Sequence, residues 1–476
     1  MSQKVISYFF FLFLILISIS VSAQTKHNFS FILKTNVGND SPYWFHTNRD
    51  GIIDDSGLGS YLIFDSAYEK KFKNDFTVSY KISPVVRWSS NSKILFPLIN
   101  TKISYKKINI QIGRFNYEEL HRLEELRTGS FVQSRNAIPI PKIELKTDFI
   151  HVPFTNELAK VKGTFTHGWF EKDRTVESPL LHQKTFYLLI GRENKFNIYA
   201  GLVHSVMWGG FSNIESIGNI PESFNDFIRS VFLGRGSDDA PLNDQNYYQG
   251  NQLGIYDLGI SFKKRDWDIE LYKQFLFEDY DGVVLRNFQD GIIGVTLEKM
   301  NLHNSRKLVE GINYEYIYTK FQNGRIHISP NSTTSGRDDY YSHTIYQNGW
   351  TSFGRVIGNP LITVRQNRDI NEYLIENNRV VAHHIGLRGD VLKNIDYIFK
   401  ATFSNNHGRY LEEQRAENYS QEYKFDPPLK QLSLYLMLTK KSEKWQSIDF
   451  SFAIAGDIGE LYQNRFGIQF GIKKGL

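Results

Sequence analysis

The chain has 476 residues, a formal net charge of +5 and no cysteine, and 15% of its residues are aromatic. The lack of cysteine excludes disulfides and thiolate metal sites, and the weak, scattered charge does not indicate nucleic-acid binding. No linker, low-complexity tract or helical repeat divides the sequence, so one continuous architecture is expected rather than several soluble domains.

Residues 1–23 have the features of a secretory signal peptide. Lys4 supplies a positive start, residues 9–19 are apolar, and the letters VSA form a small-residue cleavage site. The apolar run is too short to cross a bilayer as a helix, and no later run of about eighteen apolar residues exists. We therefore predict an exported chain whose mature part, residues 24–476, is a single domain.

Apolar and polar residues alternate with period 2 along much of the mature chain. Near the C-terminus, Ile448, Phe450, Phe452 and Ile454 alternate with small or polar residues. Similar segments begin at Phe76, Ile108, Phe196, Trp267, Ile312, Ile395, Leu432 and Phe466. Each segment predicts a strand with one apolar and one polar face.

A soluble β-sandwich also alternates in this way, with its apolar faces turned toward a shared core. Two features favour a membrane barrel. Many segments run nine or more residues, the length a tilted strand needs to cross a bilayer, and Tyr and Trp gather near segment ends. Strands in lipid must close on themselves because every backbone group needs a partner. We predict an all-β, transmembrane antiparallel barrel of about 18 strands.

Two segments break the alternation. In residues 117–127, three leucines recur at helical spacing after a start that resembles a capping box. In residues 221–233, a proline opens a stretch with one apolar face, and a glycine follows it. Both predict short amphipathic helices, which we expect at a barrel mouth or inside the lumen.

The stretch GLVHSVMWGGF, residues 201–211, contains a histidine, a tryptophan and paired glycines. His204 is in phase with a strand and has no other His, Asp or Glu at metal-ligand spacing, so a structural role is expected. Trp208 and the glycine pair indicate a strand end at a rim. No hydrolase, zinc-protease or nucleotide-binding motif occurs, so no catalytic residue, metal or cofactor is expected.

Residues 337–361 concentrate aromatic side chains among Asn and Gly. Aromatic rings stack on sugars, and Asn, Asp and Arg hydrogen-bond hydroxyls or carboxylates, as a polysaccharide-binding surface requires. An interfacial girdle with a hairpin turn would have the same composition. The candidate carbohydrate-binding residues are Trp350, Tyr346, Arg355, Tyr341 and Trp208.

Several segments resemble the Wzi family of capsule-assembly proteins, in the form found in the Bacteroidota. They are SPYWFHTNRDG, TGSFVQSRNAIPIPKIE, GLVHSVMWGG with PESFNDFIRSVFLGR, GNQLGIYDLGI, YQNGWTSFGRVIGNP and NNRVVAHHIGLRGD. The likeness extends from about residue 28 to the C-terminus. One departure is the ending FGIKKGL, because outer-membrane barrels commonly finish with an aromatic residue.

The resemblance implies an outer-membrane barrel with a small periplasmic helical element. It also implies a lectin that assembles or retains capsular polysaccharide or exopolysaccharide at the cell surface and has no catalytic activity. The expected partners are that polymer, outer-membrane lipid and the polysaccharide-export machinery, without nucleic acid.

Two other classes stay open at this stage. A transport channel would have a wet lumen tuned by inward Lys81, Glu270, Glu315 and Lys400. A hydrolase would need a nucleophile and a base that meet across strands, which spacing along the chain does not reveal.

Overall fold

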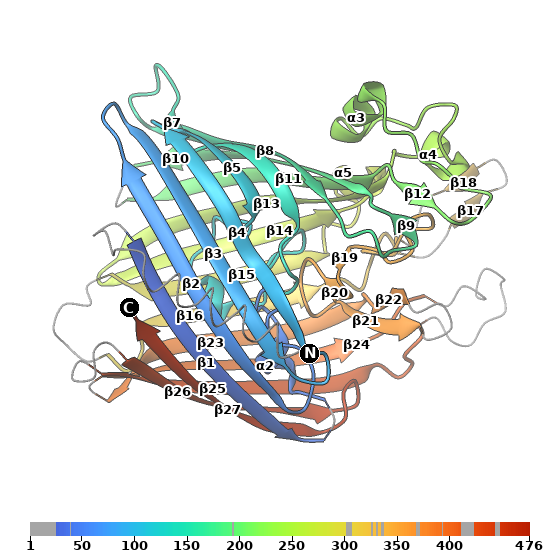
Figure 1. Cartoon of the computed structure of the whole chain (residues 1–476). Helices are drawn as coiled ribbons and strands as arrows, with labels where there is room; N and C mark the ends of the chain where they lie inside the picture. The colour runs from blue at the N-terminus through green and yellow to red at the C-terminus, as the bar shows by residue number, and fades with distance from the viewer. Residues whose placement is uncertain are drawn as a thin grey trace, which may run out of the picture.

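The computed structural model is dominated by strands (Figure 1). It describes residues 25–38, 40–192, 195–300, 307–324, 327–329, 332–334, 338–367, 372–392, 394–410, 423–442 and 448–476. The predicted signal peptide, residues 1–23, lies outside the described residues. Within the described part, no helix has the length and apolar character to cross a membrane.

One large sheet forms the wall of the molecule. Its strands are β1 (Thr25–Val37), β2 (Gly59–Lys71), β3 (Phe76–Trp88), β4 (Lys93–Tyr105), β5 (Ile108–Arg114), β6 (Pro141–Thr147), β7 (Ile150–His151), β8 (Ala159–Trp169), β10 (Leu180–Gly191), β11 (Asn197–Trp208), β13 (Asn251–Lys264), β14 (Trp267–Phe277), β15 (Gly291–Lys299), β16 (Gly311–Tyr318), β23 (Val380–Leu392), β24 (Ile395–Asn406), β25 (Leu429–Ser442), β26 (Ile448–Gly459) and β27 (Arg465–Gly475).

Successive wall strands pair antiparallel, and β1 pairs with both β2 and β27, so the sheet closes on itself. Strands β6 and β7 both pair with β8 and are two parts of one wall strand. The described wall is thus a closed antiparallel barrel of 18 strands, which confirms the predicted fold class.

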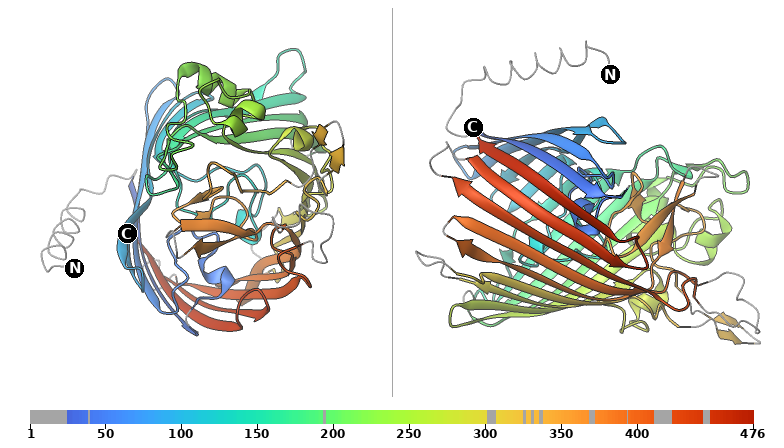
Figure 2. Two further views of the ribbon diagram at one scale, coloured as in Figure 1. Left: turned by 90° about the vertical axis from the view of Figure 1, so that its right-hand side faces the viewer. Right: turned by 90° about the horizontal axis from the view of Figure 1, so that it is seen from below.

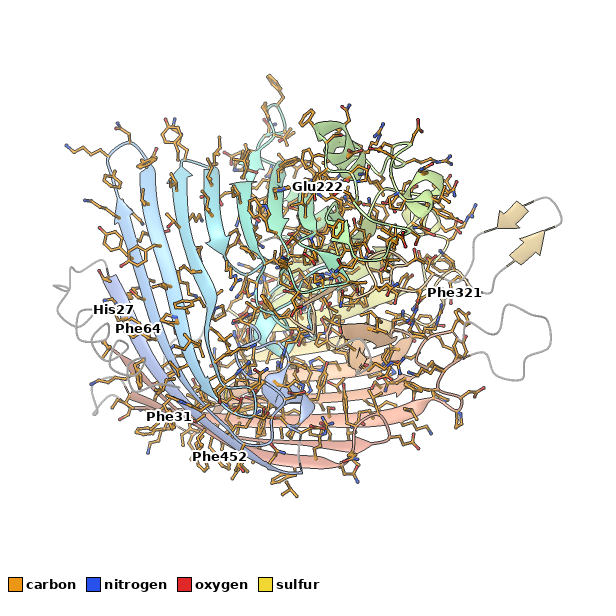
Figure 3. All side chains as sticks on the ribbon, turned by 45° about the vertical axis from the view of Figure 1, so that its right-hand side comes forward. His27, Phe31, Phe64, Glu222, Phe321 and Phe452 are labelled. Carbon is orange, nitrogen blue, oxygen red and sulfur yellow. The ribbon has the colours of Figure 1, made fainter. Side chains whose placement is uncertain are left out.

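The apolar residues of the wall point outward. On β5, Ile110 is 44% exposed, whereas its neighbour Asn109 is 3% exposed. Phe31, Phe64 and Phe452 lie on the same outer face of other strands (Figure 3). In a soluble sandwich such residues would meet in the core, so this arrangement suits a wall surrounded by lipid.

The two ends of the barrel differ. The first and last described residues lie at one end, where Asn28 of β1 pairs with Gly475 of β27. The strand connections at this end include the short residues 106–107 and 265–266. The long connections lie at the other end and are residues 38–58, 115–140, 209–250, 319–379 and 407–428. We call these the terminal end and the loop end. Outer-membrane barrels keep short turns in the periplasm, so the loop end faces the cell exterior.

Three loop-end connections send segments back into the barrel (Figure 2). We call residues 40–56, 115–140 and 338–362 the plug. They include α2 (Tyr43–His46), the 3-10 helix η1 (Glu124–Leu126) and the short strands β19 (Thr351–Ser352) and β20 (Arg355–Val356).

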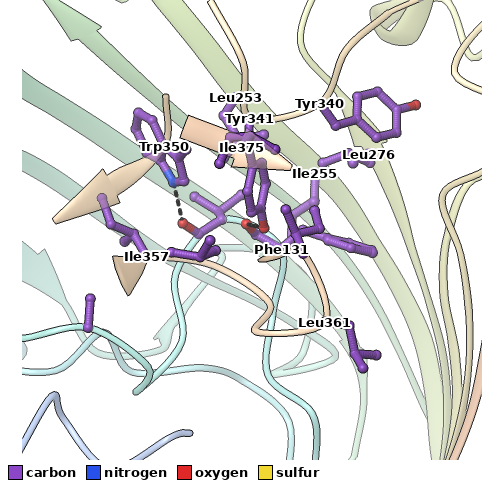
Figure 4. Close-up of a cluster of buried hydrophobic side chains, with 14 of the residues drawn as sticks. Phe131, Leu253, Ile255, Leu276, Tyr340, Tyr341, Trp350, Ile357, Leu361 and Ile375 are labelled. Atoms are coloured by element: carbon purple, nitrogen blue, oxygen red, sulfur yellow. Dashed lines mark hydrogen bonds between the residues drawn. The ribbon is translucent and has the colours of Figure 1, made fainter. Parts of the chain in front are cut away.

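The hydrophobic core lies where the plug meets the inner wall (Figure 4). Phe131 and Trp350 of the plug pack in one cluster with Leu253 and Leu276 of the wall. The Trp350 Nε1–H also donates to the carbonyl of Val132 at 2.8 Å, so the indole is satisfied inside the plug.

The remaining elements belong to loop-end connections. They are the strand pairs β9 (Val176–Glu177) with β12 (Phe211–Ser212), β17 (His327–Ser329) with β18 (Ser332–Thr334) and β21 (Thr363–Asn367) with β22 (Glu372–Asn377), and the helices α3 (Phe224–Val231), α4 (Leu242–Asn246) and α5 (Tyr280–Val283).

The helical elements differ from the sequence prediction in length and place. Within residues 117–127 the structure has only the 3-10 turn η1, because His121 and Arg127 bond to wall residues and hold the chain in an irregular conformation. Helix α3 lies within residues 221–233. Both segments come from loop-end connections, and the described terminal-end connections contain no helix. The expected periplasmic position of the helical element is therefore corrected to the external side.

Candidate functional site

Buried ion pairs fasten the plug to the wall. Arg127 Nε of the plug donates to Glu315 Oε1 of β16 at 3.1 Å, and both side chains are at most 1% exposed. His121 of the plug lies 3.0 Å from a carboxylate oxygen of Asp257 and 3.0 Å from one of Glu270. Removing one partner would leave an uncompensated charge away from water, so the plug and the wall stabilise each other.

The charge of His121 depends on these neighbours. Burial by itself lowers the pKa of the imidazole, but the Asp257 carboxylate and the hydrogen bonds to Asp257 and Glu270 raise it to about 9. The side chain is therefore an imidazolium at neutral pH.

The plug also occupies the path that a channel would need. Of the four residues expected to tune permeation, Glu270 and Glu315 are paired with plug residues, and Lys400 Nζ lies 4.3 Å from the ring centroid of Trp44 in α2. The cavity left beside Trp44 and Lys400 has a volume of about 110 Å³. A space of that size, bordered by paired charges, does not make a continuous aqueous pore.

The predicted carbohydrate-binding residues of the plug are packed inside it. Tyr341, Tyr346 and Trp350 are 0%, 1% and 2% exposed. The Tyr341 hydroxyl donates to the carbonyl of Phe131, and the Tyr346 hydroxyl donates to that of Gly209 at 3.1 Å. No ring face is free for a sugar in this arrangement, so these residues have a packing role and their contact with carbohydrate stays a prediction.

The side chain of Arg355 is also held inside the plug by hydrogen bonds. Its guanidinium donates to the carbonyls of His46 at 2.8 Å and Ile53 at 2.9 Å, and so ties β20 to the first segment of the plug. Burial lowers the pKa of Arg355 from its usual value. Its role in sugar binding also stays a prediction.

Trp208 is the last residue of β11, followed by Gly209 and Gly210 with φ of 66° and 94°, so the chain turns at a rim as expected. The indole is 2% exposed because Phe227 of α3 covers it, with ring centroids 5.7 Å apart. His204 on the same strand bonds to Gln252 through Nε2 at 2.6 Å. Among the described residues, no group of three His, Cys, Asp or Glu side chains could hold a metal ion.

A pocket of about 240 Å³ opens at the loop end beside the buried aromatic residues. We call it the loop-end pocket. Its lining residues are Asn243, Tyr247, Tyr248, Gly250, Asn251, Gln252, Glu278, Asp279, Asp338, Asp339, Ser342, His343 and Thr344. Residues 338–344 belong to the aromatic segment found in the sequence, but the lining comes from their polar side chains.

Carboxyl groups form one side of this pocket. Burial raises the pKa of Glu278 well above its usual value, although the Tyr341 N–H donates to it at 2.6 Å. Burial and the adjacent Asp279 carboxylate raise the pKa of Asp338 well above its usual value. Asp279 and Asp338 are hydrogen-bonded to each other, so one of the two carries a shared proton.

Hydrogen-bond donors form another side. Asn251 is 2% exposed, and its Nδ2 has no partner in the described structure. His343 Nδ1 accepts the N–H groups of Ile345 and Tyr346 at 3.2 and 3.3 Å, which places the ring proton on Nε2. Burial lowers the pKa of His343 to about 4, so this donor is neutral. An unsatisfied buried amide is costly unless a ligand completes it.

Tyr247 stands at the edge of the pocket and is 66% exposed. The sequence reasoning missed it, and it also missed Asn251 and Glu278. The adjacent pair Tyr247 and Tyr248 in a polar loop was an available signal, but the other lining residues come from connections far apart in the sequence.

A closed wall with an outward apolar face and a lumen filled by a plug define a bacterial outer-membrane β-barrel. A family model described as capsule assembly protein Wzi matches residues 59–375. The chain therefore belongs to the Wzi capsule assembly family.

One solved structure supports the same fold. The outer-membrane protein Wzi of Escherichia coli, described as a carbohydrate-binding barrel involved in group 1 capsule assembly, has 14% identity and a TM-score of 0.56 over 95% of this chain and 84% of its own. OccK5 of Pseudomonas aeruginosa has 7% identity and a TM-score of 0.47 over 95% and 97% of the two chains. A search among curated proteins found no match.

Proposed function

We propose that this protein binds capsular polysaccharide or exopolysaccharide at the cell surface and helps to assemble or retain it without catalysing a reaction. The observation that carries the proposal is the loop-end pocket, which combines an exposed tyrosine, buried donors and carboxyl groups on the external side of a plugged barrel. Membership of a capsule assembly family and the likeness to a carbohydrate-binding barrel support it.

The pocket offers the groups that a sugar unit needs. The Tyr247 ring stacks on a sugar face, Asn251 Nδ2 donates to a hydroxyl oxygen, and the carboxyl groups accept hydroxyl protons. The hydrogen-bonded pair Asp279 and Asp338 holds one proton and keeps one negative charge, so the pocket favours neutral or amino sugars over uronic acids.

The Asp279–Asp338 pair does not have the arrangement of the two carboxyl groups of a glycosidase. Such enzymes place two carboxyl groups about 5 to 9 Å apart on either side of the scissile bond. Asp279 and Asp338 are instead hydrogen-bonded to each other, with no room for a sugar between them. This supports a binding role without catalysis.

Two further partners follow from the two ends and the wall of the barrel. The outward apolar residues contact outer-membrane lipid. The terminal end faces the periplasm and is the side on which polysaccharide-export machinery has access to the barrel.

Deletion of the gene tests the function. The expected result is loss of cell-bound surface polymer and a matching rise of free polymer in the medium, measured with a polymer-specific stain. Complementation with the wild-type gene restores retention. Unchanged retention in the deletion strain contradicts the proposal.

Binding to purified protein tests the pocket. Oligomers of glucose, glucosamine and a uronic acid are compared by isothermal titration calorimetry. We expect measurable binding for the first two and none for the uronic acid oligomer. A preference for the uronic acid oligomer would contradict the assignment of the pocket.

A further inference from the structure

The outer face of β10 carries polar side chains where lipid-facing residues are expected. His182 and Lys184 alternate in phase with Phe186 and Ile190, which are 53% and 42% exposed. Because side chains two residues apart on a strand share a face, all four point out of the barrel. A lysine in this position would face hydrocarbon unless something covered it.

Helix α3 covers this part of the outer wall. The ring of Phe227 lies 5.3 Å from that of His182 and 5.7 Å from that of Trp208, between centroids. Lys184 Nζ donates to the carbonyl of Val231 in the last turn of the helix. Carbonyls in the last turn of a helix have no partner within the helix and attract a cation. The last turn of α3 therefore provides an acceptor for the outward-pointing ammonium group of Lys184. The helix lies beside β8 and β11 at the loop end (Figure 1).

The ends of α3 are well defined. Ser223 and Asp226 form a capping box, and Ser237 also donates to Asp226 at 3.1 Å. After the helix, Leu233 has φ of 53° and the Gly234 N–H donates to Arg229 at 2.7 Å. The polar face is therefore turned toward the following segment, which leads to the loop-end pocket.

A second apolar stripe of the helix is not buried by any part of the chain that the structure describes. Phe224, Ile228 and Phe232 are 74%, 39% and 73% exposed and recur every four residues, so they lie on one side of the helix axis. The stripe meets the wall where Lys184 Nζ lies 5.3 Å from the Phe232 ring centroid. The exposed Phe186 lies two residues after Lys184, on the same face of β10.

We propose that α3 is an interfacial helix that inserts Phe224, Ile228 and Phe232 among the acyl chains of the external leaflet. The exposed stripe continues the lipid-facing surface of β8 and β10, and amphipathic helices with such a stripe lie in the plane of a bilayer surface. This goes beyond polysaccharide binding: the helix sets the depth of the barrel and attaches the segment that builds the loop-end pocket to the membrane surface.

Spin labels test the position of α3. The chain has no cysteine, so a single introduced thiol is labelled alone. The variants are Phe224→Cys and Phe232→Cys on the helix, Phe186→Cys as the lipid control and Asp239→Cys as the water control. Each full-length protein is placed in vesicles of phosphatidylethanolamine and phosphatidylglycerol, and collision rates with oxygen and with a water-soluble nickel chelate are measured.

We expect the oxygen-to-nickel ratios at positions 224 and 232 to lie within about twofold of the ratio at 186 and well above that at 239. Ratios that match position 239 overturn the proposal. Dipolar broadening between labels at 224 or 232 also overturns it, because a second copy of the chain would then cover the stripe. The titrations of the loop-end pocket do not depend on this result, so the two proposals fail separately.

Discussion

The plug core and the loop-end pocket share one segment of the chain and have opposite properties. In residues 338–346, Tyr340, Tyr341 and Tyr346 are buried, while Asp338 and Ser342 line the pocket. The buried tyrosines belong to the apolar core that the plug shares with the inner wall. In this segment the clustered aromatic residues pack the plug, and the neighbouring polar residues line the proposed binding pocket.

The largest effect is expected from breaking the plug at its central ion pair. Arg127→Ala leaves Glu119 and Glu315 without their buried partner, at a cost of about 3 to 5 kcal/mol. We expect transient current through planar bilayers from this variant and none from the wild-type protein. Lys441→Ala, at a solvent-exposed ion pair with Asp396, is the control with little effect. A closed Arg127→Ala barrel would contradict the role assigned to this pair.

Truncating Trp350 tests whether its side chain packs the plug or binds sugar. Trp350→Ala removes a buried indole and its hydrogen bond, at about 3 to 5 kcal/mol of unfolding free energy. We expect a lower thermal transition by circular dichroism. If the variant kept wild-type stability but lost affinity for oligosaccharide, Trp350 would be a sugar contact after all.

Raising the pH should loosen the plug. The folded-state pKa of His121 is about 9, above the 6.5 of a free imidazole, so its contribution is complete below pH 6.5 and is lost as pH rises through 9. The shift corresponds to on the order of 3 kcal/mol. Thermal unfolding at pH 6, 8 and 10 measures the loss. The thermal transition temperature of His121→Gln should change less over this pH range than that of the wild-type protein. The same pH dependence in both proteins would contradict the role assigned to His121.

The smallest effect on stability, and the clearest on binding, is expected at the pocket edge. Tyr247→Ala removes one stacking ring, about 0.5 to 1.5 kcal/mol of binding energy, with the thermal transition unchanged. Phe353→Ala, another exposed aromatic residue of the loop-end connections, is the matched control with wild-type affinity. Equal affinities for both variants would place the sugar elsewhere.

The fold could be predicted because period-2 alternation is a local property. Ile110 and Asn109 already indicate which face of β5 meets lipid. The segment 117–127 was misread because its leucines fit a helix, whereas long-range bonds from His121 and Arg127 to the wall decide its conformation. Helical spacing alone cannot reveal such partners.

The sequence prediction and the proposed pocket share one segment of the chain but differ in the residues within it. Within the predicted segment, residues between 338 and 344 line the loop-end pocket. The prediction assigned sugar stacking to the aromatic side chains of the segment, because the sequence alone does not show that they are buried. Asn251 and Glu278 reach the pocket from other connections. Only the closed wall brings these segments together.

The plug has a consequence for biogenesis. The N–H of Tyr43 in α2 donates to Asp457 of β26 at 2.9 Å, across 414 positions of sequence. The first connection to be synthesised is thus held by one of the last strands to be synthesised, and contacts of such separation form late. In a barrel intermediate that lacks its C-terminal strands, α2 cannot form this hydrogen bond to Asp457, and the plug is not fixed to the wall at this position. The lumen is therefore closed only when the barrel is complete.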